Sequence, residues 1–101
     1  MTSTSGFWIV TAHNFTGFPE GKIPRWAKNR YESRYTTETI RKYYNGHIRH
    51  HSLDTCNGLD DAINKAQDLI PFCQMVSIKW SSNYKLIGTL TKSKGWIWKP
   101  E

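Results

Sequence analysis

The clearest pattern of hydrophobic and polar positions lies between Leu59 and Ile70, where apolar residues recur every three or four positions. This spacing predicts an α-helix with one apolar face, capped by Asn57 and ended by Pro71. The apolar face comprises Leu59, Ala62, Ile63, Ala66, Leu69 and Ile70. The polar side comprises Asp60, Asp61, Asn64, Lys65 and Asp68.

Patterns with a period of two predict strands before and after this helix. In residues 7–12 the side chains that would point to either face of a strand are largely apolar. This is typical of a central strand with both faces at least partly covered. Residues 76–80 alternate between apolar and polar and predict a half-buried strand. Further strands are predicted over 84–90 and 96–98, so the C-terminal part of the chain forms an antiparallel meander.

The pattern between residues 35 and 53 supports two structures. One is a helix that is capped by Thr36 or Thr37 and ends at Gly46. The other is a hairpin that turns at Asn45-Gly46. We favour the hairpin, because Thr, Ile and Tyr prefer strands and Asn-Gly is the strongest short hairpin signal.

The segment that precedes this ambiguous region carries weaker signals. Residues 13–23 include two glycines and a proline and are predicted to form a loop. Residues 25–34 follow Pro24, which favours a helix start, but they contain too few apolar residues to anchor a helix firmly. We therefore expect residues 25–34 to be weakly structured.

These elements predict an α+β fold, in which one main amphipathic helix packs on one face of a small antiparallel sheet of four to six strands. The 101 residues suit a single domain, 1–101, with one core. Residues 1–6 are small and polar and are expected to form a flexible tail.

Charge is distributed unevenly over this fold. The chain has 14 Lys and Arg against 8 Asp and Glu, a net charge of +6, and every arginine lies in its first half. Residues 20–51 hold eight cations and three acids, whereas the later residues are nearly balanced. Arginine forms forked hydrogen bonds with phosphate and carboxylate, so this asymmetry indicates a surface for nucleic acid or for an acidic protein.

The basic region also alternates with aromatic residues. Cations follow a phosphate backbone while exposed rings stack on unpaired bases, and single-stranded nucleic-acid binding needs both. Some of these rings can equally belong to the core. The candidate binding residues are Arg25, Trp26, Lys28, Arg30, Arg34, Arg41, Lys42, Tyr43, His47, Arg49 and His51.

Three histidines, His47, His50 and His51, form the most conspicuous polar cluster. On a strand, His47 and His51 would share a face with Arg49, and His50 would point to the other side. Two histidines on one face can bind zinc, but a full site needs three or four ligands and no carboxylate or thiol lies nearby in the sequence, so no metal is predicted. The His50-any-Ser52 element resembles half of the paired signature of two-histidine phosphoesterases, but the second copy is absent, since Asn14 and Phe15 follow His13.

No motif of an enzyme or a cofactor site is recognisable, so neither catalytic residues nor a cofactor are predicted. Cys56 is expected to be partly exposed and Cys73 to fill the core, both as free thiols. The chain shows no signal peptide and no transmembrane run, so we expect a cytoplasmic protein that does not enter a membrane. Its oligomeric state stays open.

The favoured function is a small, basic, non-enzymatic protein that binds nucleic acid or a nucleic-acid-processing complex. In its size, basicity and lack of motifs the chain resembles the short accessory proteins of bacterial viruses. That resemblance implies the alternative, an inhibitor that binds and blocks a host nuclease, polymerase or defence complex. A metal-independent ribonuclease that uses His47, His50 and His51 as acid and base is a distant third.

Overall fold

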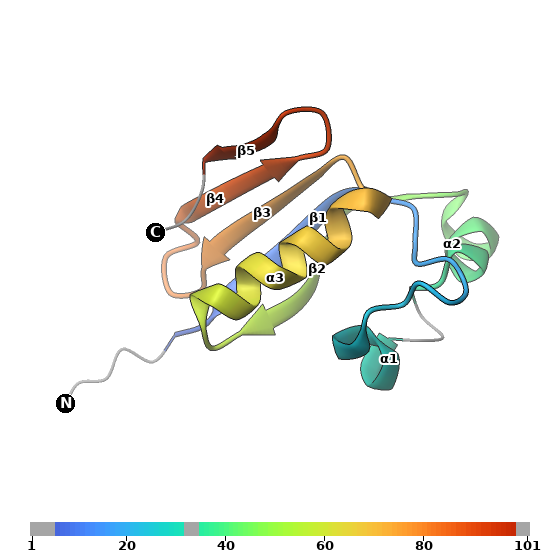
Figure 1. Ribbon diagram of the computed structural model, residues 1–101, viewed down its shortest axis with the longest axis horizontal. Helices are drawn as coiled ribbons and strands as arrows, with labels where there is room; N and C mark the ends of the chain where they lie inside the picture. Colours follow the sequence, from blue (N-terminus) through green and yellow to red (C-terminus); the bar gives the residue numbers. More distant parts are fainter. Residues whose placement is uncertain (1–5, 32–34, 99–101) are drawn as a thin grey trace.

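A five-stranded antiparallel sheet carries one long helix across one of its faces, as the ribbon in Figure 1 shows. The computed structural model describes residues 6–31 and 35–98, without the side chains of residues 29–31 and 53. Its elements in order are β1 (Trp8–Phe15), α1 (Arg25–Tyr31), α2 (Thr37–Tyr44), β2 (Ile48–Cys56), α3 (Leu59–Leu69), the 3-10 turn η1 (Ile70–Phe72), β3 (Met75–Trp80), β4 (Leu86–Thr91) and β5 (Gly95–Trp98). The predicted α+β class, with one main helix on an antiparallel sheet, is confirmed.

The strand order is β2-β1-β3-β4-β5, so the first strand lies inside the sheet. Because β2 and β3 both pair antiparallel with β1, they run in the same direction, and α3 must cross over β1 to connect them. This crossover places α3 on the sheet face. The last three strands form the meander that the sequence predicts.

Strand β1 supplies the centre of the core. Val10 and Ala12 are completely buried, and their partners on β3 are Ile78 and Val76, which are also completely buried. β1 continues to Phe15, so His13 and Asn14 belong to a strand and not to the predicted loop. The extension is possible because β1 pairs on both edges almost to its end.

Helix α3 presents its predicted apolar face to the sheet, with Ala62, Ala66 and Leu69 completely buried. Its N-cap is Gly58, which has no capping side chain, so the prediction of Asn57 as N-cap is wrong. Strand β2 extends to Cys56 and α3 begins at Leu59, so Gly58, and not Asn57, directly precedes the first helical residue. The α-helix ends before Pro71, which lies within η1.

Lys65 is buried, contrary to its predicted place on the polar side of α3. A register shift in the β1–β2 pairing places Asp54 opposite Val10, which points to the core. The buried Asp54 carboxylate requires a cation, and Lys65 Nζ donates to its Oδ2 atom at 2.7 Å. Asp61 adds an i, i+4 ion pair with Lys65 at 3.4 Å.

The predicted hairpin at Asn45-Gly46 is wrong, because residues 37–44 form helix α2. Thr36 caps the helix by accepting a hydrogen bond from the Thr39 N–H at 3.2 Å. Asn45 and Gly46 have positive φ angles of 56° and 100°, and they end the helix. Helix C-caps and tight hairpin turns both require positive φ, so the Asn-Gly signal fits either structure.

Contacts of Phe18 and Trp26 help to hold α1 and α2 to the body of the protein. Phe18 forms an isolated bridge with Thr36, and its completely buried ring packs edge-on against Phe15 and Phe72. Trp26 of α1 packs against Phe18 and donates from Nε1 to Asp68 of α3 at 2.9 Å. The predicted weakly structured segment thus includes a helix that is anchored by one aromatic side chain.

Three further predictions concern the two cysteines, the start of β4 and the N-terminal tail. Cys73 is buried as predicted, but Cys56 is buried too, at the end of β2 beneath α3. β4 begins at Leu86, and Tyr84 lies exposed in the preceding turn with a φ of 54°. Apart from Gly6, the predicted flexible tail lies outside the described residues.

Candidate functional site

The last turn of α2 brings two cations and two aromatic rings to the surface. We define the α2 surface as Arg41, Lys42, Tyr43 and Tyr44, all of which are exposed. Tyr43 is 68% and Tyr44 49% exposed, values that are high for aromatic side chains of this size. Lys42 Nζ lies 5.4 Å from the centre of the Tyr43 ring, within cation–π range.

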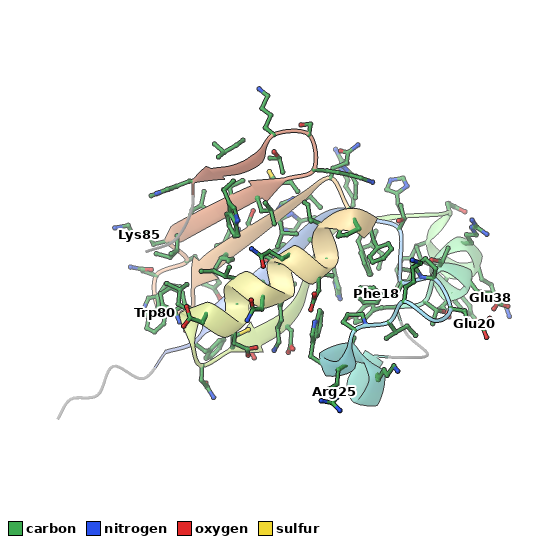
Figure 2. All side chains as sticks on the ribbon, viewed as in Figure 1. Phe18, Glu20, Arg25, Glu38, Trp80 and Lys85 are labelled. Carbon is green, nitrogen blue, oxygen red and sulfur yellow. The ribbon has the colours of Figure 1, made fainter. Side chains whose placement is uncertain are left out.

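The packing of α2 explains this exposure. Ile40 is its one buried residue and Thr37 and Thr39 are partly buried, so the helix is attached along one narrow side and its last turn faces solvent. Figure 1 shows α2 at the end of the molecule, beyond the sheet. Glu20 and Glu38 line a shallow depression beside Arg41, and Figure 2 shows them near each other. The acids therefore lie toward the start of α2 and the cations toward its end.

The predicted binding residues between positions 25 and 34 differ in their exposure, as far as the structure describes them. Arg25 and Lys28 are exposed, and Figure 2 shows Arg25 pointing away from the body. Trp26 is half-buried and takes part in the contacts with Phe18 and Asp68, so its ring is engaged in packing. The side chain of Arg30 and all of Arg34 lie outside the described residues.

The histidine cluster does not form as predicted. His47 precedes β2 and lines a depression at the end of the sheet with Gln74 and Lys92. His51 is half-buried, and its Nε2 atom is 2.6 Å from the hydroxyl oxygen of Tyr35. Arg49 and His50 are exposed on β2. The three histidines therefore occupy three different environments.

The structure instead pairs His50 with His13, a residue outside the predicted cluster. The two residues are register partners on β2 and β1, and their Nδ1 atoms are 3.2 Å apart. On its other side, His13 Nε2 is 3.0 Å from Ser77 Oγ of β3. Extending the alternation of β1 by one step, from Thr11 to His13, would have identified this position, but the glycines and proline downstream favoured a loop.

The His13–His50 pair lies on the sheet face opposite α3. Successive side chains of a strand point to opposite faces, and Val10 and Ala12 point toward α3. Thr11 and His13 therefore point to the other face, where Thr11 Oγ1 is 3.2 Å from Ser52 Oγ. Hydroxyl and imidazole groups make this part of the face polar, in contrast to the apolar face beneath α3.

The surroundings of His13 favour its neutral form. Partial burial lowers the pKa of His13 below its ordinary value of 6.5, and the nearby charges of His50 and Lys79 lower it further. The thiols behave in the opposite sense, since burial raises the pKa of Cys56 and of Cys73 to about 11. Both cysteines are therefore protonated and weakly nucleophilic at neutral pH.

Clusters of three or more metal ligands and membrane-spanning helices are both absent from the described residues. Within residues 6–31 and 35–98, no three His, Cys, Asp or Glu side chains gather closely enough to hold a metal ion. The described helices include none that is long and apolar enough to cross a bilayer.

Comparisons with protein-family models, with curated proteins and with solved structures find no match.

Proposed function

We propose that the protein binds nucleic acid, with single strands preferred, through the α2 surface and the exposed His47 and Arg49 that follow it. The observation that carries this proposal is the exposure of four consecutive residues, two cationic and two aromatic, on a helix with one buried residue. Exposed tyrosine rings leave apolar surface in contact with water, which a partner can cover favourably, and bases are flat partners that stack on such rings.

The charge of the surface supports a polyanionic partner. Arg41, Lys42 and Arg49 are exposed cations within nine residues of sequence, and the chain has a net charge of +6. Glu38 is the one acid in α2, and it lies in the first turn, away from the tyrosines. Phosphates can therefore approach Lys42 and the tyrosines at the end of α2, whereas Arg41 borders the depression that Glu20 and Glu38 line.

A non-enzymatic role and a cytoplasmic location remain parts of this proposal. Both cysteines are unpaired and buried, which supports a reducing compartment. The high pKa values of these thiols, about 11, argue against their use as nucleophiles.

The test is fluorescence anisotropy with a labelled single-stranded oligonucleotide of mixed sequence and with the matching duplex, each over a range of salt concentrations. Replacing Arg41 and Arg49 by Ala should weaken binding more than tenfold, about 1.4 kcal/mol. The slope of log affinity against log salt should fall by about 0.7 for each lost single-strand contact. Replacing Tyr43 by Ala should weaken single-strand binding by about 1–3 kcal/mol and affect the duplex less.

The matched control is the double replacement of Lys85 and Lys94 by Ala, which removes the same charge from exposed positions. Figure 2 places Lys85 at the end of the molecule opposite Glu38, far from α2. Nucleic-acid binding through α2 is excluded if the lysine pair weakens binding as much as the arginine pair. The absence of salt-dependent binding to both probes would exclude it as well, leaving an acidic protein as the alternative partner.

A further inference from the structure

The two Nδ1 atoms of His13 and His50 are separated by a distance that suits a shared metal ion. They are 3.2 Å apart, and the ring planes meet at 76°. Zinc lies about 2.0–2.1 Å from a histidine nitrogen, so two nitrogens on one tetrahedral zinc are about 3.3–3.4 Å apart. The side chains therefore need little movement to bind one ion together.

The neighbour of His13 supports the same arrangement. Ser77 Oγ is 3.0 Å from Nε2 of His13, and Ser77 is 4% exposed, so this hydroxyl is fixed within the sheet. When Ser77 accepts the hydrogen bond from Nε2–H, the proton is absent from Nδ1 and its lone pair faces His50. Metal-binding histidines are usually oriented in this way, by a hydrogen bond at the nitrogen that does not bind the metal.

A nearby positive charge limits how tightly the pair can hold an ion. Lys79 lies close enough to His13 to interact with it electrostatically, and its positive charge disfavours a bound cation. Such a site holds its ion less tightly than a structural zinc site with four protein ligands.

We propose that His13 and His50 form a two-histidine site for a late first-row divalent metal ion, Zn²⁺ in particular, with water completing the coordination. Imidazole nitrogen suits zinc, nickel and copper, whereas magnesium and calcium prefer oxygen ligands. The site lies on the sheet face opposite α3, and it uses neither the α2 surface nor Arg49. It therefore stands independently of the proposed nucleic-acid binding.

The test is isothermal titration of the full chain, produced without a histidine tag, with ZnCl₂ and with MgCl₂. One Zn²⁺ should bind for each chain, and replacing His50 by Ala should lower the affinity at least tenfold. His50 is exposed, so this replacement leaves the core intact. His13→Asn should have the same effect. His47→Ala is the matched control, since His47 is an exposed histidine that is not one of the two proposed ligands, and it should leave the affinity unchanged.

A second measurement separates loss of the site from loss of the fold. Zn²⁺ should raise the melting temperature of the parent chain and of His47→Ala, because an ion that binds only the folded state stabilises it, but not that of His50→Ala. Ni²⁺ and Cu²⁺ should bind the same residues, with Cu²⁺ the tightest. The proposal is wrong if Zn²⁺ does not bind below about 1 mM, or if His50→Ala and His47→Ala bind it equally.

Discussion

Individual side chains of this protein often depart from what their type suggests. Lys65 is a buried residue of a helix whose polar side would have suited it, and it is 8% exposed. Burial by itself lowers the pKa of Lys65, but the hydrogen bond and charge of Asp54 outweigh this and raise it above its ordinary value of 10.5. The ammonium group thus stays charged. Its ion pair with Asp54 explains why two charged side chains can be buried, which the pattern of apolar residues does not predict.

His13 provides a pH-dependent prediction at this scale. Its pKa is lowered in the folded state, so between this value and 6.5 the unfolded chain binds more protons than the folded one. The stability that His13 contributes is therefore present above 6.5 and is lost as the pH falls through the lowered pKa. NMR titration of the imidazole should give a value below 6.5.

The variant His50→Ala supplies the control for this titration. In this variant the pKa of His13 should rise only part of the way toward 6.5. The charge of His50 is removed, but the partial burial and the charge of Lys79 still lower the pKa. A parent chain in which His13 titrates at 6.5 or above would contradict the environment described for the pair.

At the scale of elements, α2 depends on a close approach of the preceding loop. Gly17 has a φ of 98°, and a Cβ atom there would lie 2.7 Å from the backbone nitrogen of Thr37. Gly21 has a φ of 81°, but a Cβ atom there would meet no other atom within 4 Å. Both glycines therefore adopt a positive φ, but only at Gly17 would an added Cβ atom collide with neighbouring backbone.

The variant Gly21→Ala should cost about 1–2 kcal/mol from backbone strain alone. Gly17→Ala should cost clearly more, because the start of α2 must also move away from the new methyl group. Urea denaturation followed by far-UV circular dichroism measures both free energies of unfolding. Equal losses in the two variants would show that the loop does not fix the start of α2.

At the scale of the whole molecule, one continuous core joins the sheet, α3 and α2. The same cluster of buried residues includes Val10 of β1, Ala66 of α3 and Ile40 of α2. Shared packing of this kind predicts a single cooperative unfolding transition, as expected for one domain of this size.

Two substitutions in different parts of this core test its continuity. Ile40→Ala should cost about 2–5 kcal/mol by leaving a cavity. Ala66→Leu should cost about 1–3 kcal/mol by overpacking the contact between α3 and the sheet. Each should shift one transition, with coinciding circular dichroism and tryptophan fluorescence curves, while Gln67→Leu on the exposed side of α3 serves as control. A separate early transition in Ile40→Ala would show that α2 unfolds independently.

The sequence by itself determined the fold class, the apolar face of α3 and the central place of β1. These features follow from the spacing of apolar residues, since a repeat of three to four suits a helix and a repeat of two suits a strand. The mixture of cations and aromatic rings in the sequence also selected Arg41, Lys42 and Tyr43, and the structure exposes all three; charged side chains such as the first two are rarely buried without a partner.

Tertiary structure alone decided the features that depend on contacts between distant residues. The choice between helix and hairpin at residues 37–46 depended on Ile40 entering the core, because Asn-Gly suits both outcomes locally. The pairs Asp54–Lys65 and His13–His50 join residues 11 and 37 positions apart, and they arise from strand register and the crossover of α3. Local patterns carry no information about register between strands, so only the folded chain could bring these groups together.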